Sequence, residues 1–586
     1  MAEDSKPVED KDSLIQKLQQ NKPPATDTAT YLTLLEMSLT QQPSILPEVH
    51  DILKSDVELT SEIGWDLVEM LIRLEDSQEC LDTVARLGNP REVILKVLEA
   101  LDKISEDEDA EKKTKQFVTL CGMLSVLHKR LKVKAPSRFV QTTLDTVRRA
   151  YAAGSPEATA AVISLVRSLS GQKRPPLPTR KSSAVIATLP TKSAATESAP
   201  DPEADTADVS DQEVVQRLLR AFITCCIDAY VNSNELEWAS RLLEYTYPEK
   251  IVPGRPTMMR AYNEVEELKE RDDLIGQLAG LADDLGLAKL SKDQVTTTLT
   301  GPVNTNPLED SAIDALSTGG YVSLLAYWMF SSDVFDAHHL LPNLALFPSH
   351  HTLLTTLLAD PQTFITSSSG TVEALVVIAL WLHTHGKIVT ATDVQPDFMA
   401  YHHLLTLIAV FHANIRVRNA ATTLAGHVLH SAPEDDRLSI LEDLIENCMF
   451  STLQACAVTW LKDEIVAATP DSRFASPDCL ESLQYTLFPD LTALPENEPA
   501  ELLSFWAEGS PYHLQVANFA VFLLSSEKHK DLVPAGMPAA IEHRYVEPLL
   551  AASEKLQKAL KDDGEEGEMV ARLEFLRDAL RRIPLQ

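Results

Sequence analysis

Residues 84–101 contain a complete junction between two helices, and this junction constrains the fold more than any other stretch of the chain. Gly88 predicts the end of the first helix, because glycine adopts the left-handed conformation at low cost. Asn89 predicts the cap of the second helix and Pro90 its first residue, and Glu92 lies three residues after the cap, as in a capping box. The stretch therefore predicts two helices joined by a tight turn.

The predicted second helix has one broad apolar face. Its apolar residues recur at spacings of three and four, namely Val93, Ile94, Val97, Leu98, Leu101 and Ile104. The same order of short amphipathic helix, polar break and short helix continues along the chain, although no repeat of fixed period aligns throughout. Because such helices cannot bury their own apolar faces, the sequence predicts an all-α, irregular HEAT/armadillo-like helical-repeat solenoid.

Changes in composition divide the chain. We expect a disordered N-terminal lead over 1–27, a helical-repeat block over 28–170, a disordered linker over 171–212 and a C-terminal HEAT-like block over 213–586 that contains a surface loop at 291–307. The linker is rich in Pro, Ser, Thr and Ala and cannot bury enough apolar surface to offset the entropy of ordering. Independent motion of the two blocks and direct stacking of the flanking helices both remain open.

Five helices are predicted near the C-terminus, over 480–487, 501–506, 513–524, 545–560 and 569–582. The last one ends in arginines, which suit the negative end of a helix. We expect it to cap the helical array.

The net charge of −34 argues against nucleic acids or anionic membranes as general partners, because Coulomb repulsion would oppose association. A basic segment of a protein partner stays compatible with this charge. The longest uninterrupted apolar run, 374–382, is far shorter than the roughly 20 residues that cross a bilayer. The N-terminus lacks the pattern of a secretion signal. We expect a soluble protein of the cytoplasm, with the nucleus as a second location.

No catalytic, cofactor-binding or metal-ligating residue is predicted. The seven cysteines form no CxxC pair and read as buried apolar residues, with a redox role for the adjacent Cys225 and Cys226 as the alternative. Eleven histidines lie between His338 and His430, but no HExxH motif occurs. The chain also lacks a phosphate-binding Gly-rich loop and a GxSxG elbow. We therefore expect no enzyme activity and no cofactor.

Two motifs resemble known repeat proteins. The stretch from Asn414 to Gly426 resembles the inner helix of a HEAT repeat, with a polar cap, a Val-Arg pair and small residues. The stretch from Leu87 to Lys96, together with Gly64-Trp65-Asp66-Leu67, resembles the N-terminal part of the YAP-binding protein and glomulin family. The predicted insert after Gly171 points to the fungal branch of this family.

This resemblance implies a protein-binding scaffold. It implies a bZIP transcription factor of the oxidative stress response as the expected partner. The alternatives that it implies are a glomulin-like inhibitor, which masks the RING subunit of cullin ubiquitin ligases through its C-terminal repeats, and a kinetochore-associated scaffold. No residue of this chain is matched to a partner contact, so the partner-binding residues stay unassigned.

Overall fold

The computed structural model describes residues 11–104, 109–171, 209–309, 315–389, 395–562 and 567–585. Within these ranges the chain forms 27 α-helices and no β-strand, apart from one isolated bridge between Phe347 and Val389. The predicted all-α helical-repeat fold is confirmed. The chain divides into two compact units, residues 1–342 and 343–586.

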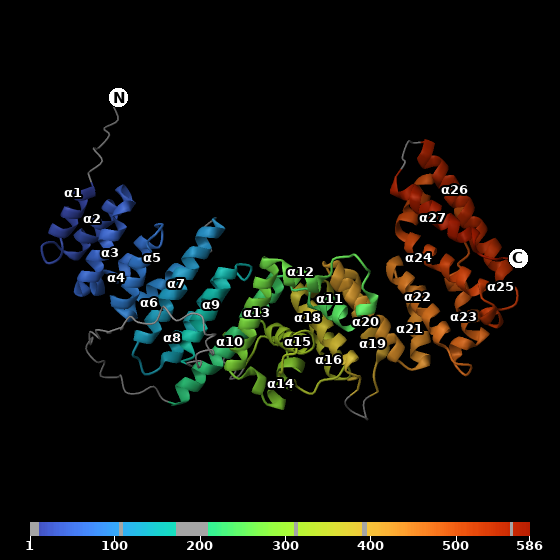
Figure 1. The fold of residues 1–586 in the computed structure, drawn as a ribbon, viewed down its shortest axis with the longest axis horizontal. Helices are drawn as coiled ribbons and strands as arrows, with labels where there is room; N and C mark the ends of the chain where they lie inside the picture. The colour runs from blue at the N-terminus through green and yellow to red at the C-terminus, as the bar shows by residue number, and fades with distance from the viewer. Residues whose placement is uncertain are drawn as a thin grey trace. The chain divides into compact units, whose positions relative to one another are not determined.

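The helices of the first unit follow one another along the chain (Figure 1). They are α1 (Lys11–Gln20), α2 (Thr28–Gln41), α3 (Leu46–Ser55), α4 (Val57–Leu71), α5 (Gln78–Leu87), α6 (Pro90–Lys103), α7 (Ala110–Arg130), α8 (Pro136–Ala150), α9 (Pro156–Leu169), α10 (Val209–Ser233), α11 (Trp238–Thr246), α12 (Met258–Glu264), α13 (Glu266–Asp284), α14 (Lys292–Thr300) and α15 (Thr318–Val334).

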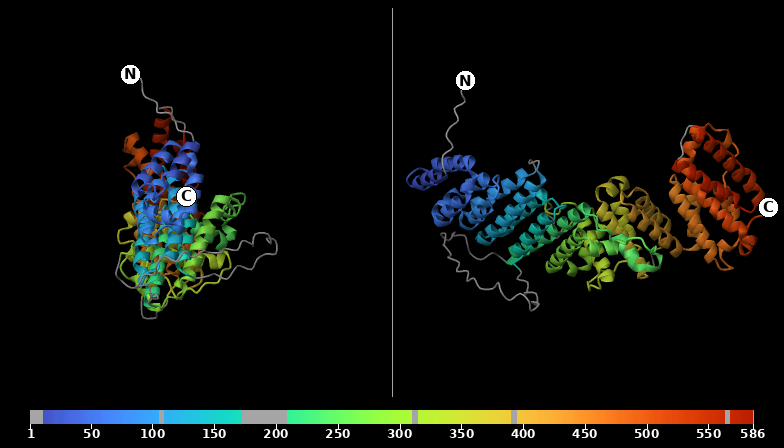
Figure 2. Two further views of the ribbon diagram at one scale, coloured as in Figure 1. Left: turned by 90° about the vertical axis from the view of Figure 1, so that its left-hand side faces the viewer. Right: turned by 45° about the horizontal axis from the view of Figure 1, so that its top comes forward.

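Ten of these helices form two layers, as in other α-solenoids. One layer runs through α3, α5, α7, α9 and α13, and the other through α4, α6, α8, α10 and α15, with each helix packed against the next in its layer. Helices that are adjacent in sequence close the space between the layers, for example α4 with α5 and α6 with α7. The side-by-side helices are visible from a second direction in Figure 2.

The second unit repeats this arrangement. Its helices are α16 (Ser349–Leu357), α17 (Pro361–Ser367), α18 (Ser369–Thr384), α19 (Phe398–Phe411), α20 (Ile415–Ser431), α21 (Glu434–Asn447), α22 (Ser451–Ala467), α23 (Pro477–Leu487), α24 (Pro499–Ser525), α25 (Met537–Ile541), α26 (Glu547–Asp562) and α27 (Glu568–Arg581). One layer runs through α17, α19, α21 and α23, and the other through α18, α20, α22 and α24. The helix lengths of both units vary widely, which explains why no fixed period is found.

The junction between α5 and α6 is present, but its chemistry differs from the prediction. Gly88 has φ −62° and ψ 165°, so it is extended and not left-handed. Asn89 accepts from the amide of Arg91 at 3.2 Å, and not from that of Glu92. Glycine is required at position 88 because a Cβ there would lie 2.7 Å from the Val84 carbonyl oxygen. Close packing, and not backbone conformation, therefore selects this glycine.

The two blocks predicted on either side of the linker stack directly. Most of the linker, residues 172–208, lies outside the described residues. Beyond it, α10 packs against α8, and α13 packs against α9. The Asn234 side chain donates to the Ala153 carbonyl at 3.0 Å, which ties the two blocks together. The boundary between the compact units falls instead after Pro342.

Three local predictions were wrong, each for a physical reason. Helix α1 forms inside the predicted disordered lead, because Leu14 and Leu18 are buried there. Helix α14 occupies much of the predicted loop at 291–307 and begins with a capping box between Ser291 and Gln294, a signal that the sequence contains. The helices predicted over 501–506 and 513–524 are one helix, α24, which continues through Pro511.

Among the described residues, no single helix combines the length and apolar character of a membrane span. The bent pair formed by α17 and α18, with an angle of 101° between them, reaches these criteria only when the two helices are taken together.

Two Gly-to-Ala substitutions, one at the tightly packed α5–α6 junction and one on open helix surface, should change the free energy of unfolding in opposite directions. We expect Gly88→Ala to lower the free energy of unfolding by about 1–3 kcal/mol, because its Cβ collides with backbone. Gly122→Ala, inside α7, meets no atom within 4 Å and should raise stability by about 0.5–1 kcal/mol. Urea unfolding of the full chain measures both. Equal effects of the two substitutions would contradict this account.

Candidate functional site

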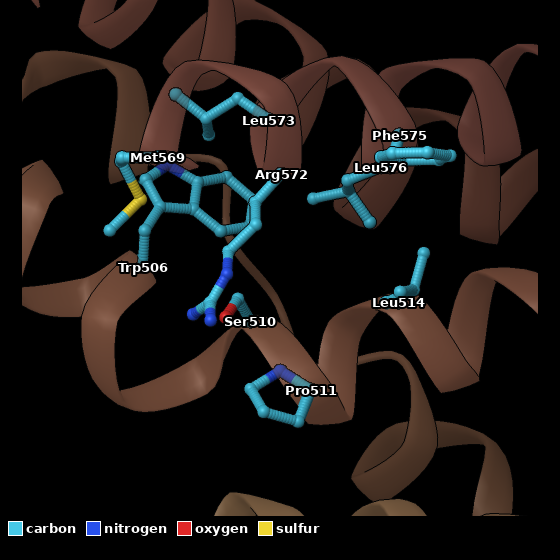
Figure 3. A pocket seen from close by; sticks show the side chains of 9 residues that line it. All are labelled: Trp506, Ser510, Pro511, Leu514, Met569, Arg572, Leu573, Phe575 and Leu576. Atoms are coloured by element: carbon cyan, nitrogen blue, oxygen red, sulfur yellow. The ribbon is translucent and has the colours of Figure 1, made fainter. Parts of the chain in front are cut away.

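An apolar hollow lies between α24 and α27 in the second unit, with a volume of about 320 Å³. Its lining residues are Trp506, Ser510, Pro511, Leu514, Met569, Arg572, Leu573, Phe575 and Leu576. Figure 3 shows Trp506 and Met569 on one side and Leu514, Phe575 and Leu576 on the other, with Arg572 extending toward Ser510. This hollow is a candidate apolar binding site.

Phe575 is the most exposed of these apolar side chains, at 72%. It lies off the stripe of α27 that carries the buried residues Leu573, Leu576 and Leu580. An aromatic ring held in water beside an apolar hollow is typical of a surface that a partner covers. Its position outside the apolar stripe of α27 is a signal that the sequence contains.

The deep wall of the hollow is Trp506, which is only 1% exposed. Its indole Nε1 has no hydrogen-bond partner among the described residues. Behind it, His513 Nδ1 lies 2.8 Å from the Tyr545 hydroxyl, and the His513 ring stacks on Phe505 with centroids 4.9 Å apart. Burial lowers the pKa of His513 to about 4, so that the imidazole is neutral at physiological pH. The wall is therefore a fixed, uncharged aromatic surface.

Pro511 shapes the rim of the hollow. Proline has no N–H, so the carbonyl of Ala507 lacks its usual donor four residues later. The helix continues because tertiary contacts hold its C-terminal half, including a hydrogen bond of 2.9 Å from the Tyr512 hydroxyl to the Thr486 carbonyl. A proline that would end an isolated helix is thus tolerated where neighbouring helices fix both halves.

A strongly acidic surface lies beside the hollow. Between Glu434 and Glu508 the sequence contains sixteen Asp and Glu against three Lys and Arg. The exposed carboxylates are those of Asp435, Asp443, Glu446, Asp463, Asp471, Asp478, Glu481, Asp490, Glu496, Glu498, Glu501 and Glu508. They lie on α21, α22, α23 and α24 and on the connections between these helices. Because α24 also forms one wall of the hollow, apolar and acidic surfaces share one helix.

A buried charge cluster fixes the helices beneath this surface. The Glu464 side chain on α22 is 2% exposed. Its Oε2 pairs with Arg437 of α21 at 2.5 Å, and its Oε1 lies 2.6 Å from Nδ1 of His430 of α20. Because removal of one partner from a buried ion pair leaves an uncompensated charge, the Glu464–Arg437 pair favours the packing of α21 against α22.

Five of the seven cysteines are buried, and Cys448 and Cys456 are half-buried. Cys225 and Cys226 are buried, and burial raises the pKa of Cys225 to about 12 and that of Cys226 well above its usual range. These thiols therefore lack the accessible thiolate that redox chemistry needs. His383 stacks on His427 with centroids 5.1 Å apart. In the described part of the chain, no three His, Cys, Asp or Glu side chains converge as metal ligands do.

A family model described as "Uncharacterised protein family, YAP/Alf4/glomulin" matches residues 7–580. The chain belongs to this family. UPF0649 protein C1442.02 of Schizosaccharomyces pombe is 33% identical over 134 residues, which cover 20% of this chain and 23% of that protein. The family predicted from the motifs at 64–67 and 87–96 is confirmed, and the fission yeast relative supports the fungal branch. Membership of the YAP/Alf4/glomulin family is consistent with a protein-binding scaffold.

Buried neutral histidines predict a loss of stability on acidification. Burial lowers the pKa of His128, His350, His402 and His513 to about 4, against 6.5 for an exposed imidazole. The unfolded chain therefore binds more protons below pH 6.5. Stability falls as the pH drops from 6.5 toward 4, by up to about 3 kcal/mol for one such group.

His402→Leu should reduce this pH dependence, because His402 is buried and its Nε2 lacks a hydrogen-bond partner among the described residues. His403→Leu is the matched control, since the neighbouring imidazole is exposed. Thermal unfolding of both variants at pH 7.5 and pH 5 measures the difference. The same pH dependence in the two variants would contradict the assignment.

Proposed function

We propose that the protein is a non-enzymatic scaffold that binds a basic, amphipathic segment of a partner protein, and that this partner is a bZIP transcription factor of the oxidative stress response. The observation that carries the proposal is the junction of the acidic surface of α21–α24 with the apolar hollow between α24 and α27. A segment that presents Lys and Arg beside leucines complements both surfaces. The family supports protein binding as the general role.

The acidic surface and the apolar hollow contribute to binding in different ways. The exposed carboxylates attract a cationic segment over a distance of about one Debye length, which raises the rate of encounter. The hollow with Phe575 and Trp506 then contributes apolar contact, which mainly slows dissociation. Arg572 at the rim pairs with Glu568, so it adds no net charge that would repel a basic partner.

Masking of a RING subunit is the second candidate function. It is favoured by the position of the hollow in the C-terminal helices, because glomulin, which the sequence resembles, acts through its C-terminal repeats. Kinetochore association, the third possibility implied by the resemblance, would use the same kind of protein contact. A cytoplasmic and nuclear location remains part of this proposal.

The position of Phe575 beside the hollow predicts that its exposed ring contributes strongly to the affinity for the partner. We expect Phe575→Ser to weaken binding to the purified bZIP factor by about 1–3 kcal/mol, or roughly 5- to 150-fold, without loss of stability, because the ring is exposed. Tyr245→Ser on α11 is the matched control, since Tyr245 is 51% exposed on the other unit. Fluorescence anisotropy with the full-length chain measures both affinities, and equal affinities would contradict the role of the hollow.

The acidic surface is tested in the same assay. Replacement of Asp443, Glu446, Asp478 and Glu481 by the corresponding amides should weaken binding and flatten its salt dependence. In cells, deletion of the gene should sensitise growth to peroxide. Normal peroxide resistance with unchanged nuclear accumulation of the factor would reject the bZIP proposal. If the purified chain does not bind the bZIP factor but lowers ubiquitin transfer by a cullin ligase, the RING alternative is established.

A further inference from the structure

A second charged surface, of opposite sign, lies in the first unit. From Lys112 to Leu144 the sequence contains eight Lys and Arg and no Asp or Glu, within a chain of net charge −34. The eight are Lys112, Lys113, Lys115, Lys129, Arg130, Lys132, Lys134 and Arg138. Five of them lie between the last turn of α7 and the first turn of α8. This is a pronounced local reversal of the charge of the chain.

Four side chains at this place are available to a ligand. Lys129, Lys132, Lys134 and Arg138, which we call the basic turn, are all exposed. None of the four forms an ion pair with any of the described residues. Carboxylates outnumber cations 86 to 52 along the chain, so neighbouring acids could readily have neutralised such a cluster. Among the described residues, no carboxylate neutralises the four cations of the basic turn.

The fifth cation, Arg130, holds the basic turn in place. Its Nη1 donates to the carbonyls of Ala85 at 2.8 Å and Gly88 at 2.9 Å. These bonds fix the end of α7 against the α5–α6 junction, where Arg86 is also exposed. These two hydrogen bonds hold the start of the basic turn in its folded form, because an extended conformation of this segment would break both of them.

The fold itself provides a carboxylate at the edge of this surface. Asp211, at the start of α10, accepts from the amide of Ser137 at 3.1 Å and from its hydroxyl at 2.5 Å. Ser137 lies in the first turn of α8, where free amides and the positive end of the helix favour an anion. A carboxylate of the chain itself is thus bound beside Arg138, which shows that this edge of the basic turn can bind a carboxylate.

We propose that the basic turn is a docking surface for an acidic segment of a protein partner. A short acidic peptide reaches the four cations while the rest of the chain, beyond a Debye length of about 10 Å, is screened. A nucleic-acid duplex or a bilayer extends much further and meets the repulsion of the remaining acidic surface. The scaffold would then bind segments of opposite charge at separate places, and this surface is independent of α21–α24.

The test uses the full-length chain and a fluorescein-labelled octa-glutamate peptide. The variant Lys129→Gln, Lys132→Gln, Lys134→Gln should bind the peptide about tenfold more weakly than the wild type, with a flatter salt dependence. The triple Lys→Arg variant should retain affinity. A matched control replaces the exposed Lys528, Lys558 and Lys561 by Gln and should bind as the wild type does.

Two results would overturn the proposal. One is peptide binding that is equal in the wild type and the Gln variant. The other is tighter binding of a short DNA duplex, or of vesicles that contain phosphatidylserine, than of the peptide, lost in the same Gln variant. Equal thermal stability of the variants excludes misfolding as the cause. Binding of the bZIP factor should be unchanged by these lysine substitutions, which separates this proposal from the proposed function.

Discussion

The structure depends on one constraint: no helix of this chain can bury its apolar face alone. The helices of the layers therefore pack against the next helix of the same layer, as α6 does against α4 and α8. The hydrophobic effect then acts across the whole stack, and local contacts suffice to build it. The outer faces and the turns contribute little to this apolar burial. Their amino-acid composition can therefore vary with the needs of binding.

That freedom explains why the charge of the chain is distributed so unevenly. Stacking requires apolar residues between the layers but sets no sign for the charges outside them. The exposed surface of α21–α24 is strongly acidic, whereas the turn between α7 and α8 is basic and has no carboxylate nearby in the sequence. A buried ion pair between Glu464 and Arg437 joins α21 to α22 and opposes the mutual repulsion of their acidic surface.

The sequence predicted the repeated helices well because their signals are local. Pro90 begins α6 and Asn414 caps α20, as expected from side chains that satisfy or spare amides at a helix start. The capping box at Ser291 is equally local. For Pro511 the local signal was misleading, because contacts from Tyr512 and His513 to neighbouring helices outweigh the preference of proline to end a helix.

The candidate sites also combine features that local sequence specifies with features that only the tertiary structure specifies. The sequence by itself determined the all-α class, the family and the places where charge gathers, because helix caps, apolar spacing and charge are properties of short stretches. Only the tertiary structure decided that Gly88 serves close packing, that α8 and α10 stack across the linker, and that Trp506 and Phe575 face one hollow. These features depend on atoms brought together from distant residues, and no local pattern specifies such distances.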